Sequence, residues 1–124
     1  MRVLKTKAFT RFARQAGLED SALCRAVAGA ERGLIDASLG GGVFKQRIAR
    51  QGQGKSGGFR AVILYRRGER AFFVYGFSKS DRANISRDEL AALKELAAEM
   101  LSYDDAQIEQ AIEAESLIEV KCNE

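Results

Sequence analysis

The sequence predicts an α+β fold, in which a small antiparallel sheet of three to four strands packs against N-terminal helices and a C-terminal helix. An extra acidic helix is expected at the end of the chain. Two observations predict this fold: apolar residues recur at helical spacing before residue 42 and after residue 86, and they alternate with a period of two from residue 43. Because 124 residues is a usual length for one domain, we expect a single domain over 1–124.

Residues 1–42 are expected to form one short strand and two helices. The strand is predicted over 3–7 and can join one edge of the sheet. The first helix follows from an apolar stripe that ends before Gly17, and it consists of Phe9, Phe12, Ala13 and Ala16. A second helix begins near Glu19 or Asp20 and meets Gly33, a residue suited to a helix C-terminus.

Residues 43–79 are expected to form a β-meander. From Val43 the chain alternates, so that Lys45 and Arg47 point to one face of a strand while Phe44, Gln46 and Ile48 point to the other. The apolar runs 59–65 and 71–77 flank the polar turn 66–69 and therefore predict a hairpin.

Residues 86–124 are expected to form two helices and a tail. Ser86 followed by Glu89 predicts a capping box, and the apolar stripe behind it predicts a helix to Leu101. Asp104 followed by Gln107 repeats the capping pattern before an acidic helix, and residues 116–120 are expected to be extended.

Charge is distributed unevenly along the chain. The whole protein carries a net charge of +3, but residues 41–82 hold ten Lys or Arg and two acids, whereas residues 83–124 hold three cations and eleven acids. The middle of the chain is therefore expected to attract polyanions. A set of solvated strands and helices is the simpler alternative.

Several kinds of chemistry are excluded or disfavoured. The chain has no histidine, the commonest general base and nitrogen ligand for metals. The segment Gly54-Lys55-Ser56 resembles the end of a nucleotide-binding phosphate loop, but Ala49 stands where the first glycine is needed and a strand follows instead of a helix. The two cysteines, Cys24 and Cys122, lack metal-ligand spacing and are predicted to be free thiols.

Cations on strands and loops, with aromatic residues nearby, are typical of a site that handles RNA. Cations hold phosphates, aromatic rings stack on unpaired bases, and loop glycines allow close approach of the backbone. Clustered cations can also support in-line cleavage, because a lysine among other cations loses its proton more readily and arginine stabilises the charge that develops on phosphate.

The ordered motifs of this middle segment resemble the RelE/HigB family of toxins from bacterial type II toxin–antitoxin systems. The motifs are Lys45-x-Arg47-Ile48-Ala49, then Lys55-Ser56-Gly57-Gly58-Phe59-Arg60, then Tyr75-Gly76-Phe77-Ser78-Lys79. They are similar to the K[RS]GGxR loop and YGFxK strand end of one branch of that family. The resemblance implies a RelE-like fold, endonucleolytic cleavage of messenger RNA on the ribosome, and translation inhibition. It implies no metal and no organic cofactor.

The resemblance also implies roles for particular residues. Lys45, Arg47, Arg60 and Lys79 are the expected catalytic residues, with Arg47 and Arg60 on the scissile phosphate and Lys45 or Lys79 handling the proton. Lys55, Arg50, Phe77 and Arg82 are the expected RNA-binding residues. The best-known family member uses a tyrosine near its C-terminal end; Phe77 and Tyr103 are candidates for that position, and the sequence does not place an equivalent.

The implied partners are a cognate antitoxin, expected to be a helix-turn-helix protein encoded adjacently, the ribosome and messenger RNA. No apolar stretch approaches the length of a membrane span and the start of the chain lacks a signal-peptide core, so we expect no membrane partner and a cytoplasmic location. Two alternatives stay open: a non-catalytic RNA- or DNA-binding module, and a ParE-like toxin directed at gyrase on the same fold.

Overall fold

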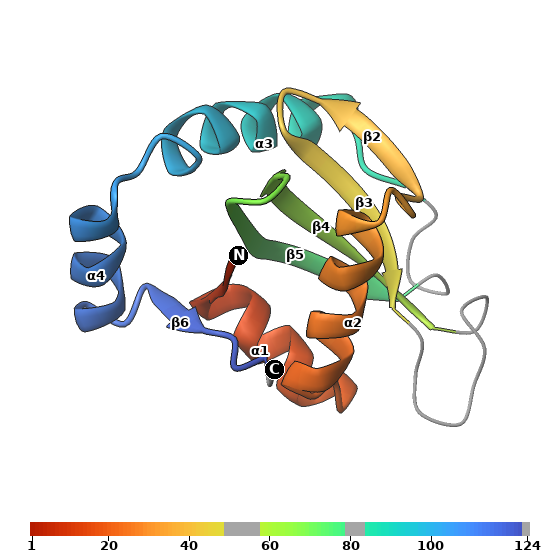
Figure 1. Ribbon diagram of the computed structural model, residues 1–124. Helices are drawn as coiled ribbons and strands as arrows, with labels where there is room; N and C mark the ends of the chain where they lie inside the picture. Colours follow the sequence, from red (N-terminus) through yellow and green to blue (C-terminus); the bar gives the residue numbers. More distant parts are fainter. Residues whose placement is uncertain (49–57, 79–83, 123–124) are drawn as a thin grey trace.

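The computed structural model describes residues 1–48, 58–78 and 84–122 (Figure 1). Within these residues the chain forms a six-stranded sheet and four helices, which confirms the predicted α+β class. The elements follow one another as β1 (Arg2–Thr6), α1 (Lys7–Ala16), α2 (Asp20–Glu31), β2 (Ala37–Gly40), β3 (Val43–Ile48), β4 (Phe59–Arg66), β5 (Arg70–Ser78), α3 (Arg87–Met100), α4 (Asp105–Glu113) and β6 (Leu117–Glu119). None of the described helices is long and apolar enough to cross a membrane.

The sheet is larger than the predicted three to four strands. Its order is β2-β3-β4-β5-β1-β6, so the predicted meander of β3, β4 and β5 forms its centre. The N-terminal strand β1 joins beside β5, in a parallel pair, and β6 then pairs antiparallel to β1. The extended segment expected over 116–120 is therefore confirmed as an edge strand, whereas β2 at the other edge was not predicted.

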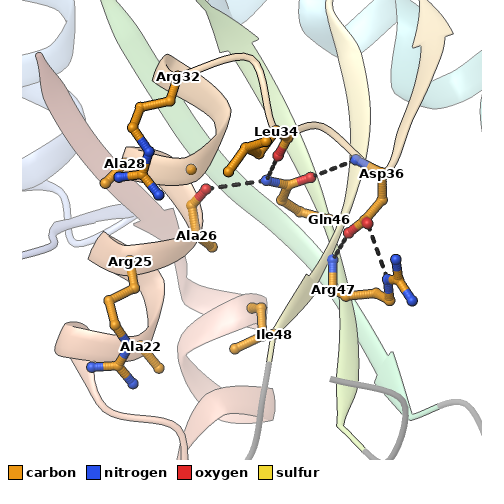
Figure 2. Close-up of a pocket in the computed structure, with 11 residues that line it drawn as sticks. Ala22, Arg25, Ala26, Ala28, Arg32, Leu34, Asp36, Gln46, Arg47 and Ile48 are labelled. Carbon is orange, nitrogen blue, oxygen red and sulfur yellow. Dashed lines mark hydrogen bonds and ion pairs between the residues drawn. The ribbon is translucent and has the colours of Figure 1, made fainter. Parts of the chain in front are cut away.

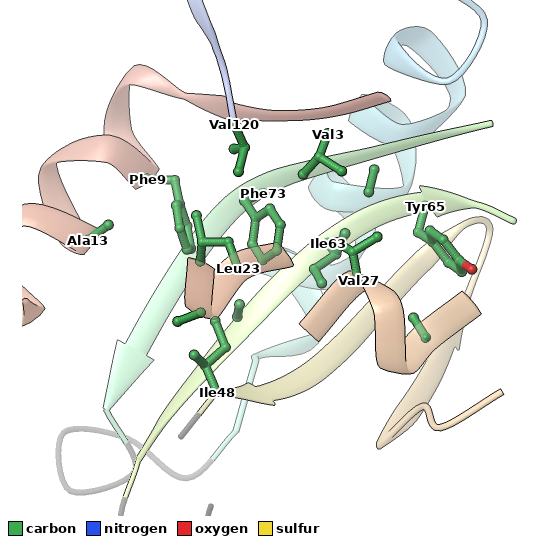
Figure 3. Packing of buried hydrophobic residues seen from close by; sticks show 14 residues of the cluster. Val3, Phe9, Ala13, Leu23, Val27, Ile48, Ile63, Tyr65, Phe73 and Val120 are labelled. Carbon is green, nitrogen blue, oxygen red and sulfur yellow. The ribbon is translucent and has the colours of Figure 1, made fainter. Parts of the chain in front are cut away.

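Each face of the sheet buries its own hydrophobic cluster. Helices α1 and α2 cover one face, where their Phe9, Leu23 and Val27 pack toward Ile63 and Phe73 of the sheet (Figure 3). Helices α3 and α4 contribute to the cluster on the opposite face, which contains Leu4, Val62, Leu64, Phe72, Ala97, Met100 and Ile108. The alternation predicted for β3 is confirmed, because Phe44 and Ile48 belong to the first cluster and Val43 to the second.

Local sequence signals explain where the helices begin and end. The side chain of Thr6 accepts a hydrogen bond from the Phe9 N–H at the start of α1, and Gly17 ends α1 with a positive φ of 71°. Both predicted capping boxes are present, Ser86 with Glu89 at α3 and Asp104 with Gln107 at α4.

The acidic helix α4 packs through a buried side chain and pairs with arginines near the start of two strands. Ile108 is fully buried. Arg2 pairs with Glu109 of α4, and Arg70 Nη2 lies 3.0 Å from Asp105 Oδ1. Since Arg70 pairs with Arg66 at the end of β4, these contacts lie at the opposite end of the strands from Arg60.

The prediction of two free thiols was wrong, because Cys24 and Cys122 form a disulfide. The pairing of β6 with β1 carries the end of the chain to α2: Val120 N–H donates to Val3 O at 2.9 Å, and Lys121 N–H donates to Asp20 Oδ2 at 3.0 Å. These contacts place Cys122 beside Cys24 although 98 positions separate them in the sequence.

Candidate functional site

Two predicted catalytic arginines lie opposite each other on neighbouring strands. The register pairs Arg47 of β3 with Arg60 of β4, and Arg60 in turn with Phe77 of β5. Lys45 lies two residues before Arg47 and therefore on the same face of the sheet. Three of the four predicted catalytic residues thus share one face, near the strand ends at Ile48 and Phe59.

Arg47 is held by a carboxylate from the connection between α2 and β2. Its Nε donates to Asp36 Oδ1 at 3.0 Å, and its backbone N–H donates to Asp36 Oδ2. The Arg47 side chain is 44% exposed and the Asp36 side chain 23% exposed. Asp36 therefore offsets part of the positive charge where two arginines meet, and it fixes the direction of one of them.

A buried glutamine connects this ion pair to helix α2. Gln46, 5% exposed, accepts from the Asp36 N–H at 2.9 Å and donates through Nε2 to Ala26 O at 3.1 Å and Leu34 O at 2.9 Å. Figure 2 shows these hydrogen bonds running from α2 through Gln46 to Asp36 and Arg47. Gln46, Asp36 and Arg47 line one side of a cavity of about 370 Å³ between α2 and β3, and Arg25 and Arg32 also line it.

Arg60 has an unused hydrogen-bond donor. Its Nη1 atom is buried and has no hydrogen-bond partner in the part of the chain that the structure describes. A buried guanidinium nitrogen without a partner is costly, and a second arginine directly across the strand pair adds repulsion. Both costs are removed by an anion that accepts from the two arginines, as a phosphate does.

The aromatic residues of the motif at the end of β5 have packing roles. Phe77 is only 4% exposed, and its ring lies 5.8 Å from that of the half-buried Tyr75. A Cβ atom added to Gly76 would lie 2.3 Å from Phe12 Cε2, so this strand position must be glycine for α1 to pack here. The expected contact of Phe77 with RNA stays a prediction.

The remaining predicted site residues are Arg50, Lys55, Lys79 and Arg82. They fall within residues 49–57 and 79–83 and lie outside the described residues. The register shows only that the flanking described residues Ile48, Phe59 and Ser78 are aligned at one end of the sheet.

Tyr103, a candidate for a family-like tyrosine, lies at the other end of the sheet. Its carbonyl oxygen accepts from Arg70 Nη1, and its hydroxyl donates to Glu99 Oε2 at 2.8 Å. That hydrogen bond raises the pKa of Tyr103 above its ordinary value. Tyr103 therefore lies at the end of the sheet away from Arg47 and Arg60. Tyr75, in contrast, lies on the same face as the two arginines, because it pairs with Val62, and Val62 pairs with Lys45.

Sequence reasoning missed Asp36 and Gln46 as parts of the site. The alternation of β3 indicated only that Gln46 points to the face opposite Arg47, among apolar residues. A glutamine in such a position needs hydrogen-bond partners when it is buried, which was the available signal that it supports a neighbouring element. Nothing in the local pattern indicated Asp36.

The fold and the site together define a class of protein: a small α+β protein whose mostly antiparallel sheet carries cations on one face of two adjacent strands. The family model described as the RelE toxin of the RelE / RelB toxin-antitoxin system matches residues 1–120. The chain belongs to the RelE toxin family, which confirms the resemblance at family level. A search of curated proteins found no match. Membership in this family implies an antitoxin partner and a toxin of the kind that generally inhibits translation.

Proposed function

We propose that this protein is a ribosome-dependent endoribonuclease that inhibits translation by cleaving messenger RNA without a metal ion. The observation that carries the proposal is the pairing of Arg47 with Arg60, since Arg60 presents a buried donor that no described residue occupies. A scissile phosphate accepts hydrogen bonds from both arginines, and their charge stabilises the pentavalent state in which a further negative charge develops.

The reaction is an in-line attack within the RNA. The 2′-hydroxyl loses its proton to a base as its oxygen bonds to phosphorus, and the bond from phosphorus to the 5′-oxygen breaks as that oxygen gains a proton. The products are a 2′,3′-cyclic phosphate and a 5′-hydroxyl. We assign the proton-handling role to Lys45 or Lys79, and RNA binding outside the reacting phosphate to Arg50, Lys55, Phe77 and Arg82.

The wider setting of this activity is part of the same proposal. From the order of its motifs, we assign the chain to the branch of the RelE/HigB family that carries the K[RS]GGxR loop and the YGFxK strand end, with a helix-turn-helix antitoxin encoded adjacently. Ribosomes and messenger RNA are the partners in the cytoplasm. Finding a small adjacent reading frame that encodes a helix-turn-helix protein would support this setting.

Cleavage on the ribosome tests the proposal directly. Purified ribosomes translating a defined messenger RNA are incubated with the protein, and new RNA ends are mapped. We expect new ends with the parent and none with the Arg47→Ala, Arg60→Ala double variant. Salt-dependent RNA binding without new ends would instead indicate a non-catalytic binding module. Inhibition of DNA supercoiling without RNA cleavage would indicate a gyrase-directed toxin.

A further inference from the structure

Among the described residues, Asp36 alone makes a hydrogen bond or ion pair with the side chain of Arg47, and it contacts just one of the three guanidinium nitrogens. Its second oxygen accepts from the Arg47 backbone N–H, so the carboxylate spans the main chain and the side chain of the same residue. An arginine on a strand otherwise samples many rotamers, and fixing it in one of them costs conformational entropy at the moment of binding. Because Asp36 already holds Arg47 in one rotamer, this entropy cost does not arise when RNA binds.

The contact with Asp36 involves Nε of Arg47, so the two terminal nitrogens of the guanidinium stay available to a phosphate. Because Asp36 binds Nε, the two terminal nitrogens of Arg47 keep the forked geometry that matches two phosphate oxygens. Asp36 is itself held in place, because its backbone N–H donates to the Gln46 side chain, which in turn donates to Ala26 O and Leu34 O. The carboxylate is thus attached to the packed α2 layer through a buried side chain.

We propose that Asp36, supported by Gln46, is a positioning residue that orients Arg47 toward the scissile phosphate. The inference rests on the proposed function and deepens it by assigning a role to a residue that touches no substrate. The positioning role and a simple electrostatic role have opposite consequences. An acid that merely lowers the local potential would weaken RNA binding, and its removal would improve cleavage. An acid that positions Arg47 supports cleavage despite its charge, so its removal impairs cleavage.

A double-mutant cycle separates the two roles. The variants are Asp36→Ala, Arg47→Ala and the combination of both, and all are assayed for cleavage on translating ribosomes. With Arg47 present, we expect Asp36→Ala to lower kcat by about tenfold to hundredfold, as misplacement of a catalytic group does. In the Arg47→Ala background, Asp36→Ala is expected to have no effect or to raise activity, because only the repulsion of RNA remains to be removed.

Matched variants control for charge and folding. Asp105→Asn removes the charge of another aspartate that lies 3.0 Å from an arginine side chain, that of Arg70, and is expected to leave kcat unchanged. Asp36→Asn keeps the size of the side chain but can no longer accept with two oxygens, so it is expected to behave like Asp36→Ala. It replaces Asp36→Ala in the cycle if the alanine variant does not fold.

Two further measurements keep the inference separate from the proposed function. The affinity for an RNA with a 2′-deoxy group at the scissile position is measured across the same cycle, and the NMR resonance of Arg47 Nε is compared between the parent and Asp36→Asn. Binding without cleavage by the parent would overturn the proposed catalytic function, while the affinity cycle would still decide the role of Asp36. Equal effects of Asp36→Ala with and without Arg47, or an unchanged Arg47 Nε resonance, would overturn the inference. Absence of both binding and cleavage would overturn both.

Discussion

Arg47 and Arg60 are directly opposed residues of an antiparallel strand pair, on the face of the sheet that also carries Lys45. Like charges in this position destabilise a sheet, and here only Arg47 has a carboxylate partner among the described residues. The arrangement therefore lowers stability at the place where it concentrates positive charge. Such conflicts between stability and local chemistry are expected at functional sites.

Replacing Arg60 with methionine is expected to stabilise the fold and abolish RNA cleavage. Methionine has a similar length, removes the charge opposite Arg47 and leaves no buried donor without a partner, so the free energy of unfolding should rise by about 1 kcal/mol. Chemical denaturation measures that change, and mapping of RNA ends on ribosomes measures activity. Arg87→Met in the first turn of α3 is the control and should change neither quantity appreciably. A less stable Arg60→Met protein would contradict the energetic argument, and retained cleavage would contradict the role in catalysis.

Gly76→Ala is expected to destabilise the protein although it changes no charged residue. The new methyl group would overlap the Phe12 ring, which also packs edge to face on Phe59 with ring centroids 5.6 Å apart. We expect a loss of about 1–3 kcal/mol in the free energy of unfolding, the usual range for an overpacked core. Phe12→Leu in the same chain should recover part of that loss, because the smaller side chain vacates the position. An equal cost of Gly76→Ala in both backgrounds would show that another contact is responsible.

The sequence predicted the parts of this fold that local patterns determine. Alternation placed Lys45 and Arg47 on one face, and the capping pairs placed the starts of α3 and α4, because each signal spans only a few residues. Strand β2 was missed because its four residues, two of them polar or glycine, carry too short a pattern. The contact of Asp36 with Arg47 was missed since it depends on how the connection after α2 meets β3.

The disulfide, which joins residues far apart in the sequence, likewise could not be predicted from local sequence patterns. Two cysteines 98 positions apart gave no spacing signal, and only the pairing of β6 with β1 brings them together. The family resemblance supplied what local patterns lacked for the site, because it connected residues on separate strands before their register was known.

The disulfide between Cys24 and Cys122 is expected to contribute strongly to stability. A cross-link that closes so long a loop reduces the conformational freedom of the unfolded chain, so the Cys24→Ser, Cys122→Ser variant should lose about 2–4 kcal/mol of unfolding free energy. Thermal and urea unfolding of both proteins measure the loss. A thiol-reducing agent should lower the stability of the parent to that of the variant and leave the variant unchanged. Two titratable thiols in the unreduced, denatured parent would contradict the cross-link.

The hydrogen bond between Tyr65 and Glu31 is expected to make stability depend on pH in the alkaline range. Burial and the bond to Glu31 raise the pKa of Tyr65 from 10.0 to about 12. Glu31 also accepts from the Gly68 N–H at 2.9 Å and so connects α2 to the hairpin turn. Because the folded-state pKa lies above the unfolded one, the stabilising contribution of Tyr65 is complete below pH 10 and is lost as the pH rises toward 12.

Tyr65→Phe tests this dependence, since phenylalanine keeps the packing of the ring but cannot ionise or donate. The parent should be more stable than the variant by about 1 kcal/mol at pH 8, the usual net value of a hydrogen bond, and the difference should shrink between pH 10 and pH 12. Urea unfolding at each pH gives the difference directly, so that the titration of lysines common to both proteins cancels. Absorbance of the phenolate gives the pKa independently. A stability difference that stays constant up to pH 12 would mean that Tyr65 ionises equally easily in the folded and unfolded chains, and that its bond to Glu31 does not stabilise the junction of α2 with the hairpin.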